Sequence, residues 1–573
     1  MKRYPKYFIA PFIFFLHIAC KNADPKPIDS TEPGSEAKES LNGSFESKFN
    51  RYTRGEAFTG KELKTWTDTA WKNDRIHKQL ILWTDKNIDD LSYEVENLKN
   101  GNNVISASNI KLRFGQYVIG DQVPTGCGEQ TNRASVEIAD ALSLTPVNKI
   151  NQYDPLKIWI TIDVPEAIAE GKYTSKIHVK TGGTTQQTFN IDVLVVNRTL
   201  PKVADWKFHL DLWQFPFQLM KFNNAQPGNS RIEPFSDTYF KQLEPFYKLL
   251  ADAGQKSITA YIKDGAFLKG ETMIKWTKNT DNTWSYNYDN FDKYVETLMS
   301  WGINKQINCF SLAGWDMNYI GYFDAATGNS ANLNVEIGSV AYKTIWNDFL
   351  NDFKTHLRAK AWFGKTVLYL DEIREENLAA VINTIKENDP NWKIGLAGSH
   401  VSSTNESALY EYSTILGTHS NTNFGADKTA TFYTSCTQLI PNNYVTPQNN
   451  PAEMTWMAWY ASNNELDGYL RWAYDYWTLS NPMNITDGGN TAGDFSLIYR
   501  SGNTYPNQPL SSIRLELLRE GIQDFEKIRI LNNSGAATSI IQHLKYFNSS
   551  SGANASKLVN TGQSLIKKTS AFP

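Results

Sequence analysis

Cysteine is scarce in this chain, which holds four cysteines among 573 residues. Cys127, Cys309 and Cys436 are far apart and odd in number, and the fourth, Cys20, belongs to the N-terminal segment treated below. Such spacing implies neither a disulfide framework nor a zinc cluster.

Concentrated positive charge is also missing. The 57 Lys and Arg residues are balanced by 60 Asp and Glu residues, and the formal net charge is −3. Nucleic-acid binding requires a concentrated basic face, so nucleic acid is not expected as a partner. After the first twenty residues, no apolar segment is long enough to span a bilayer, and we expect the rest of the chain to lie outside the membrane.

Several active-site signatures are absent from the sequence, namely HExxH, GxSxG, the complete phosphate loop GxxxxGK[ST], and GxGxxG after a strand. Their absence disfavours zinc peptidases, hydrolases with a nucleophile elbow, and nucleotide-binding enzymes. His209 and Asp211 could ligate a metal ion together, but no third ligand accompanies them. The sequence therefore predicts no metal site and no cofactor.

The N-terminal residues have the pattern of a bacterial lipoprotein signal peptide. A basic stretch precedes residues 7–19, which are mostly apolar but too few to cross a bilayer. The segment Leu-His-Ile-Ala-Cys ends at Cys20 and resembles a lipobox, whose cysteine carries acyl chains. We predict a signal peptide over 1–19 and a lipid anchor at Cys20 on the bacterial outer membrane, facing the periplasm or the cell surface. Residues 20–44 are rich in Pro, Ser, Glu and Lys, which predicts a disordered tether.

Two styles of hydrophobic patterning divide the rest of the chain. Residues 45–203 contain short apolar or alternating runs separated by turn residues, which predicts a β-sandwich domain. Residues 204–573 alternate such runs with helical patterns, which predicts a (β/α)8 TIM-like barrel with C-terminal helices. The eight barrel strands are predicted at 206–213, 256–262, 305–312, 366–371, 393–398, 413–418, 429–435 and 467–473. A doubly wound sheet is the alternative, because the gap between the sixth and seventh strands is too short for a full helix.

The most informative motif lies at the end of the fourth predicted barrel strand. Residues 367–370 are apolar, and Asp371 and Glu372 follow directly. Parallel barrels place their active sites at the carboxyl ends of their strands, and two neighbouring acids tend to differ in protonation. The alternative is a helix N-terminus, where acidic residues are common. Adjacent acids suit the hydrolysis of a glycosidic bond in a 2-acetamido sugar. One acid protonates the leaving oxygen, and the other orients the acetamido group, whose carbonyl oxygen acts as the nucleophile.

Other candidates come from the remaining strands of the same barrel. His209, Asp211 and Trp213 alternate with leucines in the first strand, so we expect them to face inward. Aromatic residues make up 13% of the chain, and the C–H faces of sugars stack on aromatic rings. The predicted substrate-binding residues are His209, Asp211, Trp315, Tyr433 and Trp472, with Asp264 and Asp316 as further candidates. The alternatives are core packing for Tyr433 and Trp472 and turn capping for Asp264 and Asp316.

Four segments, at 157–179, 368–377, 467–477 and 511–531, resemble glycoside hydrolase family 123. The second segment reads LYLDEIREEN and matches the adjacent Asp-Glu pair of that family. The resemblance implies an N-terminal β-sandwich, a C-terminal barrel, and retaining, substrate-assisted release of terminal β-linked N-acetylgalactosamine from a glycan. It implies that Glu372 is the general acid/base and that Asp371 polarises the acetamido group. Two alternatives stay open: a β-N-acetylhexosaminidase of broader or glucosamine specificity, and a tethered glycan-binding lipoprotein without turnover.

Overall fold

A computed structural model describes most of the chain from residue 41 onward. The last residues of the predicted tether, 42–44, belong to strand β1 (Asn42–Glu46) instead. The described residues are 41–128, 133–263, 271–314, 319–399, 401–418, 424–425, 427–486 and 489–571. The predicted signal peptide and Cys20 lie outside them, and so do Asp264, Trp315 and Asp316. In the part of the chain that is described, no helix combines the length and the apolar character that crossing a membrane requires.

The N-terminal domain consists mostly of β-strands in two sheets. One sheet has the strand order β1-β3-β9-β7-β8-β25-β24, and the other has the order β2-β11-β10-β5-β6 with β4 added against β10. The strands are β1 (Asn42–Glu46), β2 (Thr65–Lys72), β3 (Arg75–Trp83), β4 (Leu91–Val95), β5 (Leu98–Asn100), β6 (Asn103–Ile105), β7 (Ile110–Asp121), β8 (Ser135–Ser143), β9 (Leu156–Asp163), β10 (Gly171–Thr181), β11 (Thr184–Thr199), β24 (Tyr499–Arg500) and β25 (Pro509–Ser512). Along β10 buried and exposed side chains largely alternate, and Ile177 and Val179 join Ile158 and Ile160 of the other sheet in one core, as in a β-sandwich.

The C-terminal domain contains eight parallel strands in a nearly closed barrel. They are β12 (His209–Leu212), β13 (Ser257–Tyr261), β16 (Gln306–Phe310), β19 (Thr366–Asp371), β20 (Lys393–Ala397), β21 (Glu411–Ile415), β22 (Thr429–Tyr433) and β23 (Gly468–Arg471). Each strand pairs with its neighbours in chain order, β23 returns to β12, and a bridge between Leu210 and Gln255 joins β12 to β13. A doubly wound sheet would stay open at its edges, so the barrel prediction is supported and the alternative is not. The sixth strand begins at Glu411, two residues earlier than predicted.

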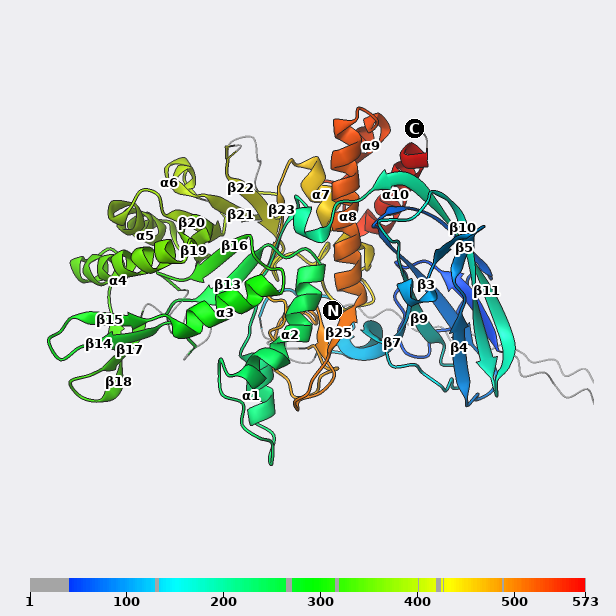
Figure 1. Cartoon of the computed structure of the whole chain (residues 1–573), viewed down its shortest axis with the longest axis horizontal. Coiled ribbons are helices and arrows are strands. Elements are labelled where there is room, and N and C mark those ends of the chain that lie inside the picture. Colours follow the sequence, from blue (N-terminus) through cyan, green and yellow to red (C-terminus); the bar gives the residue numbers. More distant parts are fainter. Residues whose placement is uncertain are drawn as a thin grey trace, which may run out of the picture. The chain divides into compact units, whose positions relative to one another are not determined.

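Helices alternate with these strands and pack around the barrel, as Figure 1 shows for α3, α4 and α5. The helices are α1 (Gln218–Asn224), α2 (Asp237–Asp252), α3 (Asp289–Ser300), α4 (Val340–Ala359), α5 (Glu375–Asn388), α6 (Ser403–Ala408), α7 (Ala452–Asn463), α8 (Ile513–Asn533), α9 (Thr538–Leu544) and α10 (Ala555–Ala571). Between β21 and β22, the described residues form no helix, as the short gap predicted. A small sheet of β14 (Lys275–Lys278), β15 (Trp284–Asn287), β17 (Tyr319–Asp324) and β18 (Asn329–Asn334) was not predicted.

The sequence-based view of the cysteines was wrong. Cys127, in the connection between β7 and β8, forms a disulfide with Cys436, which follows β22. The two residues are 309 positions apart, so only the folded chain brings their α-carbons to 4.7 Å. Cys309 is a free, buried cysteine in β16. The disulfide therefore links a loop of the β domain to the end of a barrel strand.

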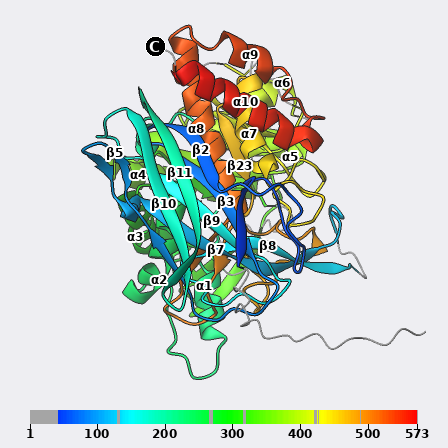
Figure 2. The ribbon, with the colours of Figure 1, turned by 90° about the vertical axis from the view of Figure 1, so that its right-hand side faces the viewer.

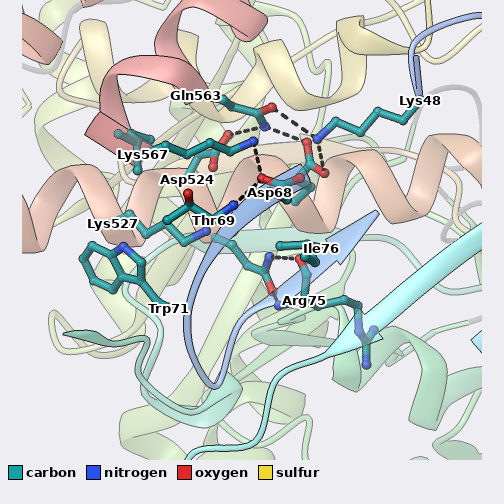
Figure 3. Close-up of a pocket in the computed structure, with 13 residues that line it drawn as sticks. Lys48, Asp68, Thr69, Trp71, Arg75, Ile76, Asp524, Lys527, Gln563 and Lys567 are labelled. Carbon is teal, nitrogen blue, oxygen red and sulfur yellow. Dashed lines mark hydrogen bonds and ion pairs between the residues drawn. The ribbon is translucent and has the colours of Figure 1, made fainter. Parts of the chain in front are cut away.

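The C-terminal helices α8 and α10 lie beside strands of the β domain in Figure 2, and charged side chains join them. Lys567 of α10 bonds to Asp68 of β2 at 2.5 Å, and Lys527 of α8 bonds to Asp74 at 2.7 Å. Figure 3 shows the residues that line a pocket at this junction. The cavity has a volume of about 30 Å³. That volume is about one water molecule and is far too small for a sugar ring. The cavity therefore belongs to the packing between the domains rather than to a substrate site.

Candidate active site

Asp371 and Glu372 lie at the carboxyl end of β19, where the backbone conformation changes. Neighbouring residues of a regular strand point to opposite faces of the sheet, so adjacent acids would normally diverge. Glu372, however, has a φ of +39°, a left-handed conformation that is uncommon for residues other than glycine. Backbone strain of this kind concentrates at functional sites. The turn at Glu372 allows its carboxylate to reach the inward-facing side of the barrel beside Asp371.

A hydrogen bond from Tyr433 shows on which side of the barrel strands the carboxylate of Glu372 lies. Tyr433 ends β22, which lies across the barrel opening from β19, and its hydroxyl donates a hydrogen bond of 2.9 Å to Glu372 Oε1. Burial, then the charge and hydrogen bond of Glu372, and then the charge of Asp371 raise the pKa of Tyr433 well above its ordinary value. Tyr433 therefore remains a neutral donor throughout the physiological range. Two predicted acids and one predicted binding residue thus meet at one end of the barrel.

The exposure of the two acids differs from that of their tyrosine partner. Glu372 is exposed and Asp371 is half-buried, whereas Tyr433 is only 6% exposed. A group that transfers a proton to a substrate must be accessible, and a group that orients it is better held rigidly. The arrangement gives one accessible carboxyl group, a second acid beside it, and a buried hydroxyl that fixes the first.

Trp472 lies next to this group, just after β23. Leu470 of β23 pairs with Tyr433, and Trp472 is two residues nearer the carboxyl edge on the same face. Its indole Nε1 donates to Asp494 Oδ2 at 3.2 Å, and its ring makes edge contacts with Phe215 and Phe495. Trp472 is half-buried, so part of the residue is accessible to solvent.

His209 and Asp211 lie in the barrel interior, in a network that includes Glu411. One ligand-type atom of each of the three residues lies within 4.8 Å of the others, close enough to surround a metal ion. Their oxygens already receive hydrogen bonds, however: Asn308 donates to Asp211 at 2.9 Å, and Tyr369 donates to Glu411 at 3.1 Å. Hydrogen bonds alone are sufficient to explain the cluster.

Burial and mutual charge shift the pKa values in this network. Burial, then the charge of Glu411, raises the pKa of Asp211. Burial alone would lower the pKa of His209, but the charge of Glu411 outweighs it and raises that pKa. The charge of His209 likewise lowers the pKa of Glu411 against the effect of burial. The network therefore favours a His209–Glu411 ion pair with Asp211 nearby.

This placement argues against the direct substrate contact predicted for Asp211, which is completely buried. His209, Asp211 and Glu411 meet inside the barrel, so the inward face of β12 was predicted correctly, but the depth at which Asp211 is buried was not. Tyr369, the partner of Glu411, lies two residues before Asp371 on the same face of β19. The network therefore supports the barrel floor below the acids. The sequence analysis missed Glu411 because the predicted sixth strand started two residues too late.

A parallel barrel with two neighbouring acids and aromatic side chains at the carboxyl ends of its strands has the architecture and the groups of a glycoside hydrolase. Residues 223–531 match the glycoside hydrolase 123 catalytic domain, and residues 43–181 match the glycoside hydrolase 123 N-terminal domain. The chain belongs to glycoside hydrolase family 123 and is a glycoside hydrolase. The resemblance drawn from the sequence is thereby confirmed.

One solved structure agrees with this assignment at the level of the fold. A family 123 glycoside hydrolase from Clostridium perfringens, studied for glycolipid glycan hydrolysis, superposes with a TM-score of 0.81 at 23% identity over 92% of this chain and 97% of that one. A family 39 glycoside hydrolase from Bacteroides cellulosilyticus WH2 reaches a TM-score of only 0.31 at 11% identity, covering 80% of this chain and 81% of its own. No curated protein matches the chain.

Proposed function

We propose that this glycoside hydrolase releases terminal β-linked N-acetylgalactosamine from glycans by a retaining, substrate-assisted mechanism. The observation that carries the proposal is the turn at Glu372, which brings two sequence-adjacent acids to one side of the barrel beside Tyr433. Conventional glycosidases place their two carboxyl groups on opposite sides of the scissile bond. Adjacent acids leave the far side of the sugar without a protein nucleophile, which the substrate's own acetamido oxygen can replace.

In this mechanism Glu372 protonates the glycosidic oxygen while the acetamido carbonyl oxygen attacks the anomeric carbon. The glycosidic bond breaks, the aglycone leaves with the proton, and an oxazolinium ion forms. Asp371 orients the amide and balances the positive charge that develops on it. Glu372 then removes a proton from water, which opens the oxazolinium ion with net retention. The intramolecular nucleophile needs no separate encounter, which lowers the entropic barrier.

The similar Clostridium perfringens enzyme, studied for glycolipid glycan hydrolysis, supports a glycan substrate. The lipobox-like sequence at Cys20 supports a lipid anchor that would hold the enzyme at the outer membrane, where glycans outside the cytoplasm are within reach. The Cys127–Cys436 disulfide supports an oxidising compartment such as the periplasm or the cell surface. Metabolic labelling with an alkyne-tagged fatty acid tests the anchor, and Cys20→Ala is expected to abolish the label.

To test the catalytic proposal, a purified protein of residues 21–573 is assayed with aryl glycosides as substrates. The protein is expected to release p-nitrophenol from the β-N-acetylgalactosaminide, and Glu372→Gln is expected to lose more rate on poor leaving groups than on activated ones. Asp371→Asn is expected to lose rate on both kinds of substrate. Equal wild-type activity on the matching galactoside, which lacks the acetamido group, would contradict substrate assistance. Preference for the glucosaminide would favour a β-N-acetylhexosaminidase, and binding without turnover would favour a glycan-binding lipoprotein.

A further inference from the structure

The connection between β7 and β8 of the β domain reaches the carboxyl edge of the barrel. Its Cys127 is bonded to Cys436, three residues after Tyr433. Its Arg133 donates a hydrogen bond of 3.0 Å to the carbonyl of Thr486, in the segment that follows β23. The second guanidinium nitrogen of Arg133 bonds at 3.0 Å to Asp121, at the end of β7. The β domain is therefore fastened to two segments that leave adjacent barrel strands.

From this attachment, a short chain of hydrogen bonds runs toward the active site. The backbone N–H of Gly128 donates to Asn490 Oδ1 at 3.1 Å, and Asn490 Nδ2 donates to Asp494 Oδ2 at 2.9 Å. A backbone N–H can only donate and a carboxylate can only accept, so one orientation of the Asn490 amide satisfies both ends. Asp494 is 1% exposed, and its other carboxylate oxygen pairs with the buried Arg471. The carboxylate is therefore held in place by bonds at both oxygens.

The last member of the chain is Trp472. Its indole Nε1 donates to the same Oδ2 of Asp494 that receives Asn490. The ring also makes edge-on contacts, with centroid distances of 4.9 Å to Phe495, 5.7 Å to Tyr476 and 5.9 Å to Phe215. Aromatic contacts restrict the position of a ring, but a directional hydrogen bond also fixes its tilt.

We infer that Asn490 is a positioning residue: it acts through Asp494 to orient Trp472 for the glycan, and the Cys127–Cys436 disulfide holds the β-domain loop on which Asn490 depends. The inference rests on the proposed function in one respect, because it requires Trp472 to contact the sugar. Through this chain the β domain contributes to the substrate-binding site of the barrel without itself touching substrate. We call this chain of hydrogen bonds, from Gly128 through Asn490 and Asp494 to Trp472, the relay. Loss of the relay weakens glycan binding and leaves the bond-breaking step at Asp371 and Glu372 unchanged.

The test measures kcat and KM separately for Asn490→Ala, with whichever aryl hexosaminide the wild type cleaves. We expect KM to rise about 3- to 10-fold, the effect of one or two lost hydrogen bonds, while kcat changes less than about twofold. Adding Asn490→Ala to Trp472→Phe, which lacks the indole donor, is expected to raise KM no further. Additive effects in this double-mutant cycle would show that Asn490 does not act through Trp472 and would overturn the inference.

Two further measurements separate positioning from general destabilisation. Asn481→Ala is the matched control, because Asn481 caps a turn of the same segment by accepting the Met483 N–H at 3.0 Å. It is expected to leave KM unchanged, and an equal rise in KM would contradict a specific role for Asn490. If Asn490→Ala does not fold, Asn490→Asp replaces the donor facing Asp494 by a repelling carboxylate at nearly constant volume. That variant is expected to raise KM at least as strongly, and an unchanged KM would overturn the inference.

The disulfide is tested on the wild-type enzyme. Reduction, verified by thiol titration, is expected to raise KM in the same direction as Asn490→Ala, and reoxidation is expected to restore it. An unchanged KM in the fully reduced enzyme would remove the disulfide from the relay. Failure of the wild type to cleave the N-acetylgalactosaminide would contradict the proposed function instead, since the relay is measured on the substrate that is cleaved.

Discussion

The hydrogen bond between Tyr433 and Glu372 gives the sharpest test of the active-site geometry. Tyr433→Phe removes one hydroxyl from a side chain that is 6% exposed and keeps the ring that fills the space. The lost bond, 2.9 Å long, is made to a carboxyl group, and such bonds contribute about 1.5–3 kcal/mol. If Glu372 must be held in place in the transition state, kcat/KM falls about 10- to 150-fold.

The assay compares aryl glycosides with good and poor leaving groups. The loss is expected to be greater for poor leaving groups, because only these depend strongly on protonation by Glu372. Tyr469→Phe is the control. Tyr469 is a buried tyrosine of β23, the strand beside β22, and its hydroxyl forms a hydrogen bond of 2.7 Å with that of Thr434. Among the described interactions it has no contact with Glu372. A loss below about threefold for Tyr433→Phe, or the same loss for both variants, would refute the assigned geometry.

Three other predictions concern stability. Burial raises the pKa of Asp475 to about 7, so the stability that its protonated form contributes is present below pH 4 and is lost as the pH rises through 7. Asp475→Asn does not titrate and is therefore expected to gain stability relative to the wild type between pH 5 and pH 8. A difference in Tm that does not change with pH would contradict this. Gly468→Ala places a Cβ 1.9 Å from the carbonyl oxygen of His209 and is expected to cost several kcal/mol in urea unfolding, whereas Gly364→Ala, with open space around it, is expected to be neutral. Arg113→Met leaves the buried Glu516 without its arginine partner and is expected to lower the free energy of unfolding by about 3–5 kcal/mol. A second change, Glu516→Gln, is expected to restore part of that loss. An unchanged free energy of unfolding in Arg113→Met would refute a paired buried charge.

Local sequence determined much of the barrel. The fourth strand was predicted at 366–371 and has those bounds in the structure, because a short apolar run bounded by polar residues has the length of a strand rather than of a helix. The same local pattern located Asp371 and Glu372 at the carboxyl edge. Alternation in the first strand predicted correctly that His209 and Asp211 face inward.

Tertiary structure decided the features that join distant segments. Periodicity gives the face of a strand but not its height in a tilted barrel, so it could not show that Asp211 lies in the floor with Glu411. The Cys127–Cys436 disulfide spans 309 residues, and β25 extends a sheet of the β domain from far along the chain, although neither segment carries a local signal of its partner. The left-handed conformation of Glu372 and its bond to Tyr433 likewise depend on two strands being brought together. Sequence supplied the reactive groups and the strands that carry them, and only the nearly closed barrel, through its register and its loops, determined which of those groups meet.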